Sequence, residues 1–317
     1  MTPFARSIAA RLLQALMTAW LLASLCFALT HALPGDTALR IAAARVGEDR
    51  LTQQAVERIR AEAGLDRPIL AQYGTWMTQL ATGDLGRSMV SGRKVADELA
   101  HHARYTFGLG AVGWLLSYAI ALPIGVWAGF RPGGLVDRAS LGFSVLLASL
   151  PPFLTGIGLI AVFALALRWL PPAGFRTASH MVLPAVTLAL GLAAFSVRII
   201  RAAVAEVRAA FYMTFARIRG LGALAAFRHH GLRNAAIPVA TFAALQFAYV
   251  VDGFVVIETL FNYPGLGELL VKALLARDVP IIMGAALLIG LLYAALNLAA
   301  DLVCLALDPR RAARVVA

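Results

Sequence analysis

The chain has 317 residues, of which 60% are hydrophobic and only 14% are charged, and its mean hydropathy is +0.77. Soluble domains rarely have this composition, which is typical of a protein with several membrane-spanning helices. The formal net charge is +11, but the arginines lie beside apolar runs and are not interleaved with exposed aromatic residues. We therefore expect lipid contact and membrane topology to account for the charge, with no nucleic-acid partner.

Runs of about 18 or more mostly apolar residues predict six membrane spans. In chain order, the predicted spans are Ile8 to His31, Tyr105 to Phe130, Ala139 to Leu170, Met181 to Val204, Ala236 to Ile257 and Ile281 to Leu307. The third run is over-long, and the adjacent Pro151 and Pro152 predict a helix that is kinked or broken into tilted pieces.

The first span admits a second interpretation, because Arg6 and Arg11 precede it as in a cleaved signal peptide. Its apolar stretch is longer than the usual signal core, which favours a retained membrane anchor. Leu25 stands where a lipoprotein signal would have a small residue, so we do not expect lipidation of Cys26. Cys26 and Cys304 both lie in apolar runs far apart in the chain, which predicts neither a disulfide framework nor a metal site.

Between the first two spans lies a long segment, residues 32–104, with ten basic and nine acidic residues. Long segments cross the membrane largely regardless of charge, so we place this one on the outer side. Apolar residues at helical spacing predict two amphipathic helices in it, one from Leu51 to Ala63 before Gly64, and one from Ile69 to Leu80 after Pro68. Packing on the membrane surface or on the span ends is favoured for both over direct substrate contact.

An arginine-rich segment, Arg198 to Pro238, separates the fourth and fifth spans and holds seven arginines but one acid, Glu206. The positive-inside rule places this segment, and both chain termini, in the cytoplasm. Phe211 to Leu221 predicts a short helix ended by Gly220, followed after a turn at Gly222 by a second stretch leading to Pro238. A basic loop held against anionic lipid would explain the arginines, but not the ordered pattern of Gly, His, Arg and Asn.

Several ordered motifs give this chain a resemblance to a known family. The cytoplasmic motifs are Ala216-Arg217-Ile218-Arg219-Gly220-Leu221 and His230-Gly231-Leu232-Arg233-Asn234-Ala235 with Pro238. The remaining motifs are Leu33-Pro34-Gly35-Asp36, Gly64-Leu65-Asp66-Arg67-Pro68, Gly83-Asp84-Leu85-Gly86-Arg87-Ser88, Glu258-Thr259-Leu260-Phe261-Asn262-Tyr263-Pro264-Gly265-Leu266-Gly267, Arg277-Asp278-Val279-Pro280 and Leu307-Asp308-Pro309-Arg310. Over nearly its whole length, the chain resembles the inner-membrane permeases of binding-protein-dependent ATP-binding-cassette (ABC) importers for dipeptides, oligopeptides and nickel.

The resemblance implies that the helix ending at Gly220 is a coupling helix, seated in a groove of a separate ATPase subunit. The residues to which it assigns this coupling are Tyr212, Ala216, Arg217, Arg219, Gly220, Leu221, His230, Arg233 and Asn234. Arginines suit charge-assisted bonds to a partner, the glycines permit a sharp break, and the last three residues would brace the second helix against the first. Phe211, Thr214 and Phe215 depart from the family pattern, which points to a more apolar groove.

The resemblance also implies an all-α membrane protein with six transmembrane helices, an amphipathic-helical outer segment and a cytoplasmic coupling helix. Its ranges are 1–31 for the N-terminus and first span, 32–104 for the periplasmic segment, 105–309 for the permease core and 310–317 for the cytoplasmic tail. The expected setting is the bacterial inner membrane. The implied partners are a second permease subunit, one or two kinds of ABC ATPase, a periplasmic binding protein and membrane lipid.

The only lysines, Lys94 and Lys272, do not follow a glycine-rich phosphate-binding loop. We therefore expect a transporter subunit with no catalytic residues and no cofactor of its own, and place ATP and Mg²⁺ on the partner ATPase. Arg219, Gln72 to Trp76 and Leu183 to Val186 are similar to nickel-type members, while peptide-type members share much of the rest. The cargo, peptides or nickel and other metal chelates, therefore stays open.

Asp252 lies inside an apolar span, where a carboxylate is costly and normally faces a cavity or a partner. One hypothesis is that Asp252 lines the translocation pathway and favours a cationic group, with Glu258 near the outer end of the same helix. A carboxylate paired with a residue of the partner permease is an equally good interpretation of Asp252.

The sequence also leaves two other function classes open. A secondary transporter could share six spans and a buried acid, although no convincing internal repeat is visible. An intramembrane enzyme would need a converging catalytic set, whereas His31, His101, His102 and His180 fall at span ends or in outer loops. A metal site at His229 and His230 is not expected, because adjacent helical side chains point about 100° apart.

Overall fold

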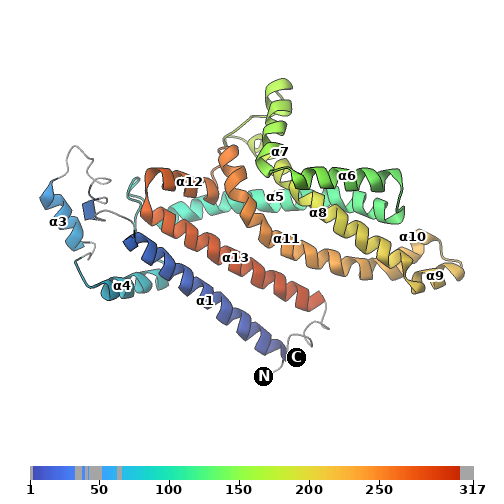
Figure 1. The fold of residues 1–317 in the computed structure, drawn as a ribbon, viewed down its shortest axis with the longest axis horizontal. Helices are drawn as coiled ribbons and strands as arrows, with labels where there is room; N and C mark the ends of the chain where they lie inside the picture. The colour runs from blue at the N-terminus through green and yellow to red at the C-terminus, as the bar shows by residue number, and fades with distance from the viewer. Residues whose placement is uncertain (1–2, 33–37, 40–41, 43–51, 63–65, 308–317) are drawn as a thin grey trace. The chain divides into compact units, whose positions relative to one another are not determined.

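The computed structural model describes residues 3–32, 38–39, 42, 52–62 and 66–307. Within these residues the fold is helical throughout, and the only strand-like pairing is an isolated antiparallel bridge between Arg87 and Lys94 (Figure 1). The motifs at 33–36 and 308–310, Gly64 with Leu65, and the tail 310–317 lie outside the described residues.

The chain packs into two compact units. Unit 1 comprises Met1–Leu12, Thr106–Pro264 and Ala295–Ala317, and unit 2 comprises Leu13–Tyr105 and Gly265–Ala294. The ranges 1–31, 32–104, 105–309 and 310–317 follow sequence features and stay a prediction.

Three described helical segments are long and apolar enough to cross a membrane: Val95–Phe130, Ala178–Ala209 and Val279–Cys304. The helix pair Leu135–Ser149 and Pro152–Ala166 would make a fourth span if its two pieces, bent by 106°, count as one. The predicted break at Pro151 and Pro152 is thus confirmed. The chain is a multi-pass membrane protein, whose described residues supply three or four of the six predicted spans by this criterion.

Unit 1 contains the start of α1 (Pro3–Ala32), the end of α13 (Val279–Leu307) and, between them in the chain, the part of α5 (Val95–Phe130) that follows Tyr105. After it come α6 (Leu135–Ser149), α7 (Pro152–Leu159), the π-helical segment η2 (Ile160–Ala166), the 3-10 turn η3 (Ala178–Met181) and α8 (Val182–Ala209). The unit continues through α9 (Phe211–Ile218), α10 (Ala223–Ala226), the π-helical turn η4 (Phe227–Gly231) and α11 (Leu232–Leu260). Both α11 and α1 contain a predicted span without being among the candidates above.

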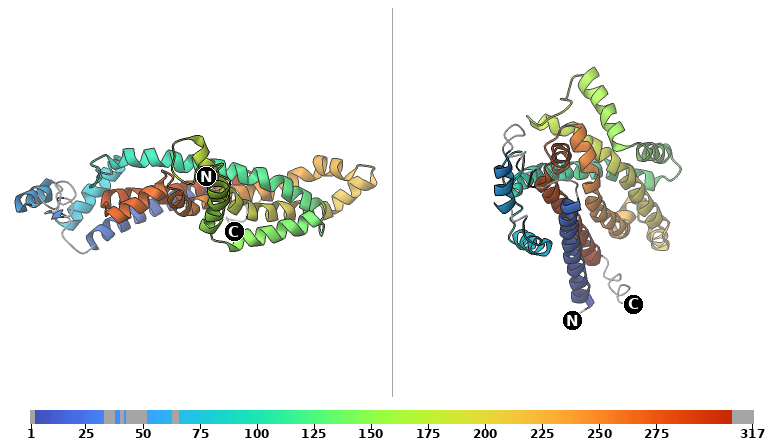
Figure 2. Two further views of the ribbon diagram at one scale, coloured as in Figure 1. Left: turned by 90° about the horizontal axis from the view of Figure 1, so that it is seen from above. Right: turned by 60° about the vertical axis from the view of Figure 1, so that its left-hand side comes forward.

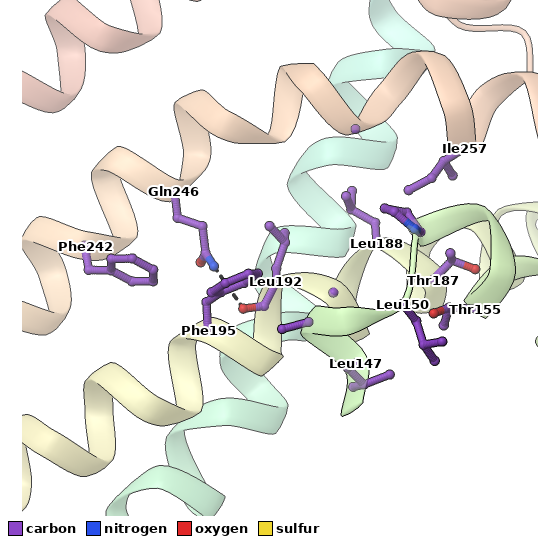
Figure 3. Close-up of a pocket in the computed structure, with 14 residues that line it drawn as sticks. Leu147, Leu150, Thr155, Thr187, Leu188, Leu192, Phe195, Phe242, Gln246 and Ile257 are labelled. Atoms are coloured by element: carbon purple, nitrogen blue, oxygen red, sulfur yellow. Dashed lines mark hydrogen bonds between the residues drawn. The ribbon is translucent and has the colours of Figure 1, made fainter. Parts of the chain in front are cut away.

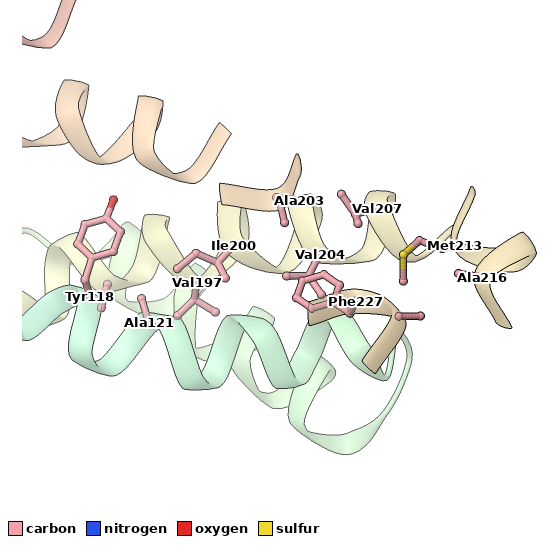
Figure 4. Packing of buried hydrophobic residues seen from close by; sticks show 13 residues of the cluster. Tyr118, Ala121, Val197, Ile200, Ala203, Val204, Val207, Met213, Ala216 and Phe227 are labelled. Atoms are coloured by element: carbon pink, nitrogen blue, oxygen red, sulfur yellow. The ribbon is translucent and has the colours of Figure 1, made fainter. Parts of the chain in front are cut away.

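Small residues bring α5 and α8 close together in unit 1. A Cβ atom on Gly125 would lie 2.8 Å from the Ile200 Cβ, and one on Gly129 would lie 2.6 Å from the Val204 Cβ. Two glycines four residues apart form the small-residue face that lets membrane helices approach. Figure 4 shows Ile200 and Val204 of α8 against α5, in a buried cluster that continues to the end of α8 and beyond.

Unit 2 contains most of α1 (Pro3–Ala32), together with α3 (Gln53–Glu62), α4 (Ile69–Ala81), α12 (Leu266–Ala276) and the first part of α13 (Val279–Leu307). Helices occur where two amphipathic helices were predicted in residues 32–104, as α3 and α4. The buried core of this unit joins the start of α5 to α12 and α13, through Val95, Leu99, Leu266, Ala273, Ile281 and Ala285.

Candidate functional site

The candidate site is the projection formed by α9, α10 and η4, which follows the end of α8 (Figure 2). Ala210 ends α8 with an extended ψ of 143°, and α9 begins at the next residue. The predicted short helix is confirmed, with bounds Phe211–Ile218. Gly220 has φ of +90°, a left-handed conformation that favours glycine. Gly222 has φ of −62°, which any residue adopts, so only one of the two glycines is needed for the break.

One face of α9 anchors the projection in the core of unit 1. Met213 is 2% exposed and Ala216 is 6% exposed, and both belong to the same buried cluster as Phe227 of η4. A second tie comes from Asn234 of α11, whose Nδ2 donates to the Tyr212 hydroxyl at 3.0 Å. The structure thus joins Tyr212 to Asn234 and buries Ala216 in the core, while the side chains of His230 and Arg233 are exposed.

The opposite face of α9 is both apolar and exposed. Phe211 is 84% exposed, Ile218 is 77% exposed and Phe215 is 54% exposed. Leu224 of α10 adds a fourth exposed apolar side chain, and Arg217 and Arg219 are also exposed. We call Phe211, Phe215, Ile218 and Leu224 the tip patch. Such a patch with basic residues at its edge is suited to binding another protein.

The histidines of η4 do not converge on one point. The ring centroids of His229 and His230 lie 6.5 Å apart, and both side chains are exposed. Among the described residues, no group of three or more His, Cys, Asp or Glu side chains could hold a metal ion.

At the far end of α11, Glu258 is fully buried and accepts a hydrogen bond from the Thr106 hydroxyl of α5 at 2.7 Å. The motif that follows it is a packed turn, in which Phe261 and Tyr263 are each 1% exposed. The Phe261 carbonyl accepts a bond from the Gly174 amide at 2.8 Å, and the Tyr263 ring packs edge-on against Phe175. Asp252 belongs to α11, but its side chain lies outside the described residues.

A cavity of about 480 Å³ opens between α6, α7, α8 and α11 in unit 1 (Figure 3). Apolar residues form most of its wall. Among its polar groups, the Gln246 amide donates to the Leu192 carbonyl at 2.9 Å and accepts from Ser196 at 3.0 Å. The Thr187 hydroxyl donates to the Leu183 carbonyl at 2.8 Å. With these groups bonded inside the chain, the wall suits an apolar group better than a charged one.

An ion pair that the sequence did not single out lies beside the end of α5. Arg201 donates from Nε to Asp137 Oδ1 at 2.7 Å and from Nη2 to Oδ2 at 2.9 Å, and Asp137 is 2% exposed. The two residues are 64 positions apart. In the sequence Arg201 was one of seven arginines in a basic segment and Asp137 stood beside Arg138, so neither pattern indicated a partner.

Comparison with known families decides the class of this protein. Residues 121–313 match the model of the family described as binding-protein-dependent transport system inner membrane component, and residues 4–106 match the model of its N-terminal region. The chain belongs to this family of permeases.

Two curated relatives show how far the likeness of this permease extends. It is 38% identical over 292 residues to the probable peptide ABC transporter permease protein y4tP of Sinorhizobium fredii, covering 90% of this chain and 92% of the relative. It is 37% identical over 299 residues to the glutathione transport system permease protein GsiC of Escherichia coli O6:H1, covering 94% of this chain and 96% of the relative. The permease is therefore a transport component of the ABC importer class. This result supports the importer interpretation over a secondary transporter or an intramembrane enzyme.

Proposed function

We propose that this permease is one of two subunits that form the translocation pathway of an ATP-driven importer for peptide-like cargo. The y4tP relative is named for peptides and the GsiC relative for glutathione, a tripeptide-like molecule. Neither name gives specific support to nickel or metal chelates. A periplasmic binding protein delivers the cargo, and one or two kinds of ATPase subunit bind the ATP and Mg²⁺.

The observation that carries this proposal is the tip patch. Three of its exposed apolar side chains lie on α9, whose other face is held by Met213 and Ala216 in the core of unit 1, and Leu224 of α10 adds the fourth. Exposed apolar area on a firmly anchored element is stabilised by burial against a partner, while Arg217 and Arg219 can bond its acids or carbonyls. The partner we propose is the ATPase, with α9 as the coupling helix. The groove of the ATPase that receives α9 would be apolar, which agrees with the exposure of Phe211 and Phe215.

The proposed setting is the bacterial inner membrane, with six spans and both termini in the cytoplasm. The two helices needed beyond the four candidates are α1 and α11, which have 30 and 29 residues. Helices of this length exceed the roughly 20 residues needed to cross a bilayer. The arginine-rich segment around α9 then faces the ATPase.

Within the pathway, we propose that Asp252 faces the cargo and favours a cationic group such as a peptide amino terminus. Glu258 takes part at the outer end by bracing α5 to α11 through Thr106, since its carboxylate is buried. Normal uptake of cationic and neutral peptides alike by an assembled Asp252→Asn importer would contradict the role given to Asp252.

The coupling role is tested by purifying a tagged permease from mild detergent and measuring the ATPase that accompanies it. Phe215→Ala is the test variant, and Phe143→Ala of α6 is the matched control, because both phenylalanines are 54% exposed in unit 1. We expect Phe215→Ala to reduce the recovered ATPase at least about tenfold, because partner-facing aromatic residues carry much of the binding energy. Phe143→Ala should recover wild-type amounts.

Two results would contradict the proposal at different levels. If wild type came down with no ATPase and no second permease, the assembly itself would be refuted. If wild type and both variants recovered equal ATPase, the importer would stand and the docking face on α9 would be wrong.

A further inference from the structure

The turn between α5 and α6 is closed by the side chain of Asp137. Gly133 has φ of +79°, and its amide donates to Asp137 Oδ2 at 2.8 Å. The same oxygen accepts a bond from Arg201 Nη2 at 2.9 Å, while Oδ1 accepts one from Arg201 Nε at 2.7 Å. A bidentate contact of this kind fixes both the distance and the orientation of its partners.

A second arginine of α8 holds the other side of this turn. The Arg208 guanidinium donates to the Phe130 carbonyl at the end of α5, and its central carbon lies 4.9 Å from the Phe130 ring centroid. A cation at a helix C-terminus is favourable because the last carbonyls carry partial negative charge. The end of α5 and the start of α6 are therefore both bound to α8, the former through Arg208 in the last turn before α9 and the latter through Arg201 further back along α8.

The same turn also contacts the projection itself. The Phe130 ring meets the Phe227 ring of η4 edge-on, with centroids 4.9 Å apart. Phe227 shares a buried cluster with Met213 and Ala216 of α9. Two sets of contacts therefore connect the α5–α6 turn to the segment that holds α9, one through the arginines of α8 and one through Phe227.

Helix α6 contacts α8 both at this attachment and further along its length. Of its 15 residues, only Asp137 and Ser144 are buried, whereas α8 buries side chains along most of its length. Leu141 and Leu147, at helical spacing around Ser144, are half-buried, and α6 packs against α8 beyond its first turn as well. Beyond α6 lies the 106° bend that leads to α7 and the cavity wall.

We propose that Asp137 is a positioning residue for coupling. Its bidentate contact with Arg201 transmits movement of α9 to the broken span α6–α7. This inference rests on the proposed function, because it takes α9 to be the coupling helix. It assigns to Asp137 and Arg201 a part in transmission, not in holding ATPase or cargo.

The test uses the complete importer in liposomes, with its binding protein and a peptide digest of casein plus glutathione as cargo. The measured quantity is the ratio of ATP hydrolysis with the loaded binding protein to hydrolysis without it. We expect Asp137→Asn to lower this ratio about tenfold, within the range usual for coupling between sites, while the ATPase is recovered in wild-type amounts. The exposed Arg198, one turn before Arg201 on α8, supplies the control Arg198→Gln, which should leave the ratio unchanged.

Arg201→Lys keeps the positive charge but cannot form the bidentate contact. It is the second test variant, for use if the Asp137→Asn importer fails to assemble. A reduced ratio in an assembled Arg201→Lys importer supports the positioning role. An unchanged ratio in it would overturn that role, because charge neutralisation alone would then suffice. A wild-type importer that assembles without any stimulation would instead refute the proposed function on which the inference rests.

Discussion

The contact between Gly129 and α8 sets the spacing of two helices in unit 1. A Cβ atom on Gly129 would lie 2.6 Å from the Val204 Cβ and 2.8 Å from the Arg201 carbonyl oxygen. Neither neighbour can move as the end of a flexible side chain can, since one is a branched Cβ and the other is backbone. Because Arg201 also holds Asp137, a shift of α8 at this point would disturb the α5–α6 turn as well.

We therefore expect Gly129→Ala to destabilise the permease by about 1–3 kcal/mol, as overpacking of tight helix contacts does. The measurement is thermal unfolding in detergent, monitored as the loss of monodisperse protein with rising temperature. Gly142 of α6 is the matched control, because a Cβ there would meet nothing within 4 Å. Gly142→Ala should be neutral or stabilising. Equal melting temperatures for the two variants would show that α5 and α8 are not in close contact at Gly129.

At the scale of single elements, the loop before α5 is held to the start of α13 by one carboxylate in unit 2. Asp278 is 4% exposed, accepts a bond from the Ser88 hydroxyl and accepts another from the Met89 amide at 3.1 Å. The Ser88 oxygen in turn accepts the Ser91 amide at 2.8 Å. The motifs at 83–88 and 277–280, far apart in sequence, are thus joined in one hydrogen-bonded cluster.

Asp278→Ala should loosen this loop, because it leaves a buried hydroxyl and an amide without an acceptor, at a cost of about 1–3 kcal/mol. Limited trypsin digestion measures the effect directly, since Arg87 and Arg93 flank the affected residues. We expect faster cleavage at these arginines than in wild type. The control is Asp97→Ala, which removes an exposed carboxylate from the first turn of α5. Cleavage at equal rates in both variants would show that Asp278 does not hold this loop.

The elements also show what sequence patterns can and cannot predict. Local signals predicted α9, because the glycines that end it, at 220 and 222, lie directly after it in the chain. The Pro151-Pro152 pair likewise predicted the bend between α6 and α7. Asp137 with Arg201, and Asp278 with Ser88, were not predicted, because 64 and 190 residues separate the partners. Charge alone does not indicate which distant side chain a buried carboxylate will meet.

For the whole molecule, the number of spans decides which surfaces face the ATPase and which face the binding protein. Six spans with the N-terminus inside place α9 in the cytoplasm and α12 outside, because α11 crosses between them. If α11 did not cross, α9 and α12 would lie on the same side. The exposed residues Leu224 and Lys272 therefore report on α11, since they stand before and after it in the chain.

We expect single cysteines at these two positions to be labelled from opposite sides of the membrane by an impermeant thiol reagent. Both native cysteines, Cys26 and Cys304, are buried and would first be replaced by alanine. In intact spheroplasts Lys272→Cys should react and Leu224→Cys should not, and both should react after the membrane is opened. Reaction of both in intact spheroplasts would remove α11 as a span and place the tip patch outside, where no ATPase could reach it. The labelling thus tests the coupling helix and the topology together. The segment that contains α9 can meet an ATPase only if it lies on the cytoplasmic side, which requires α8 and α11 to cross the membrane before and after it.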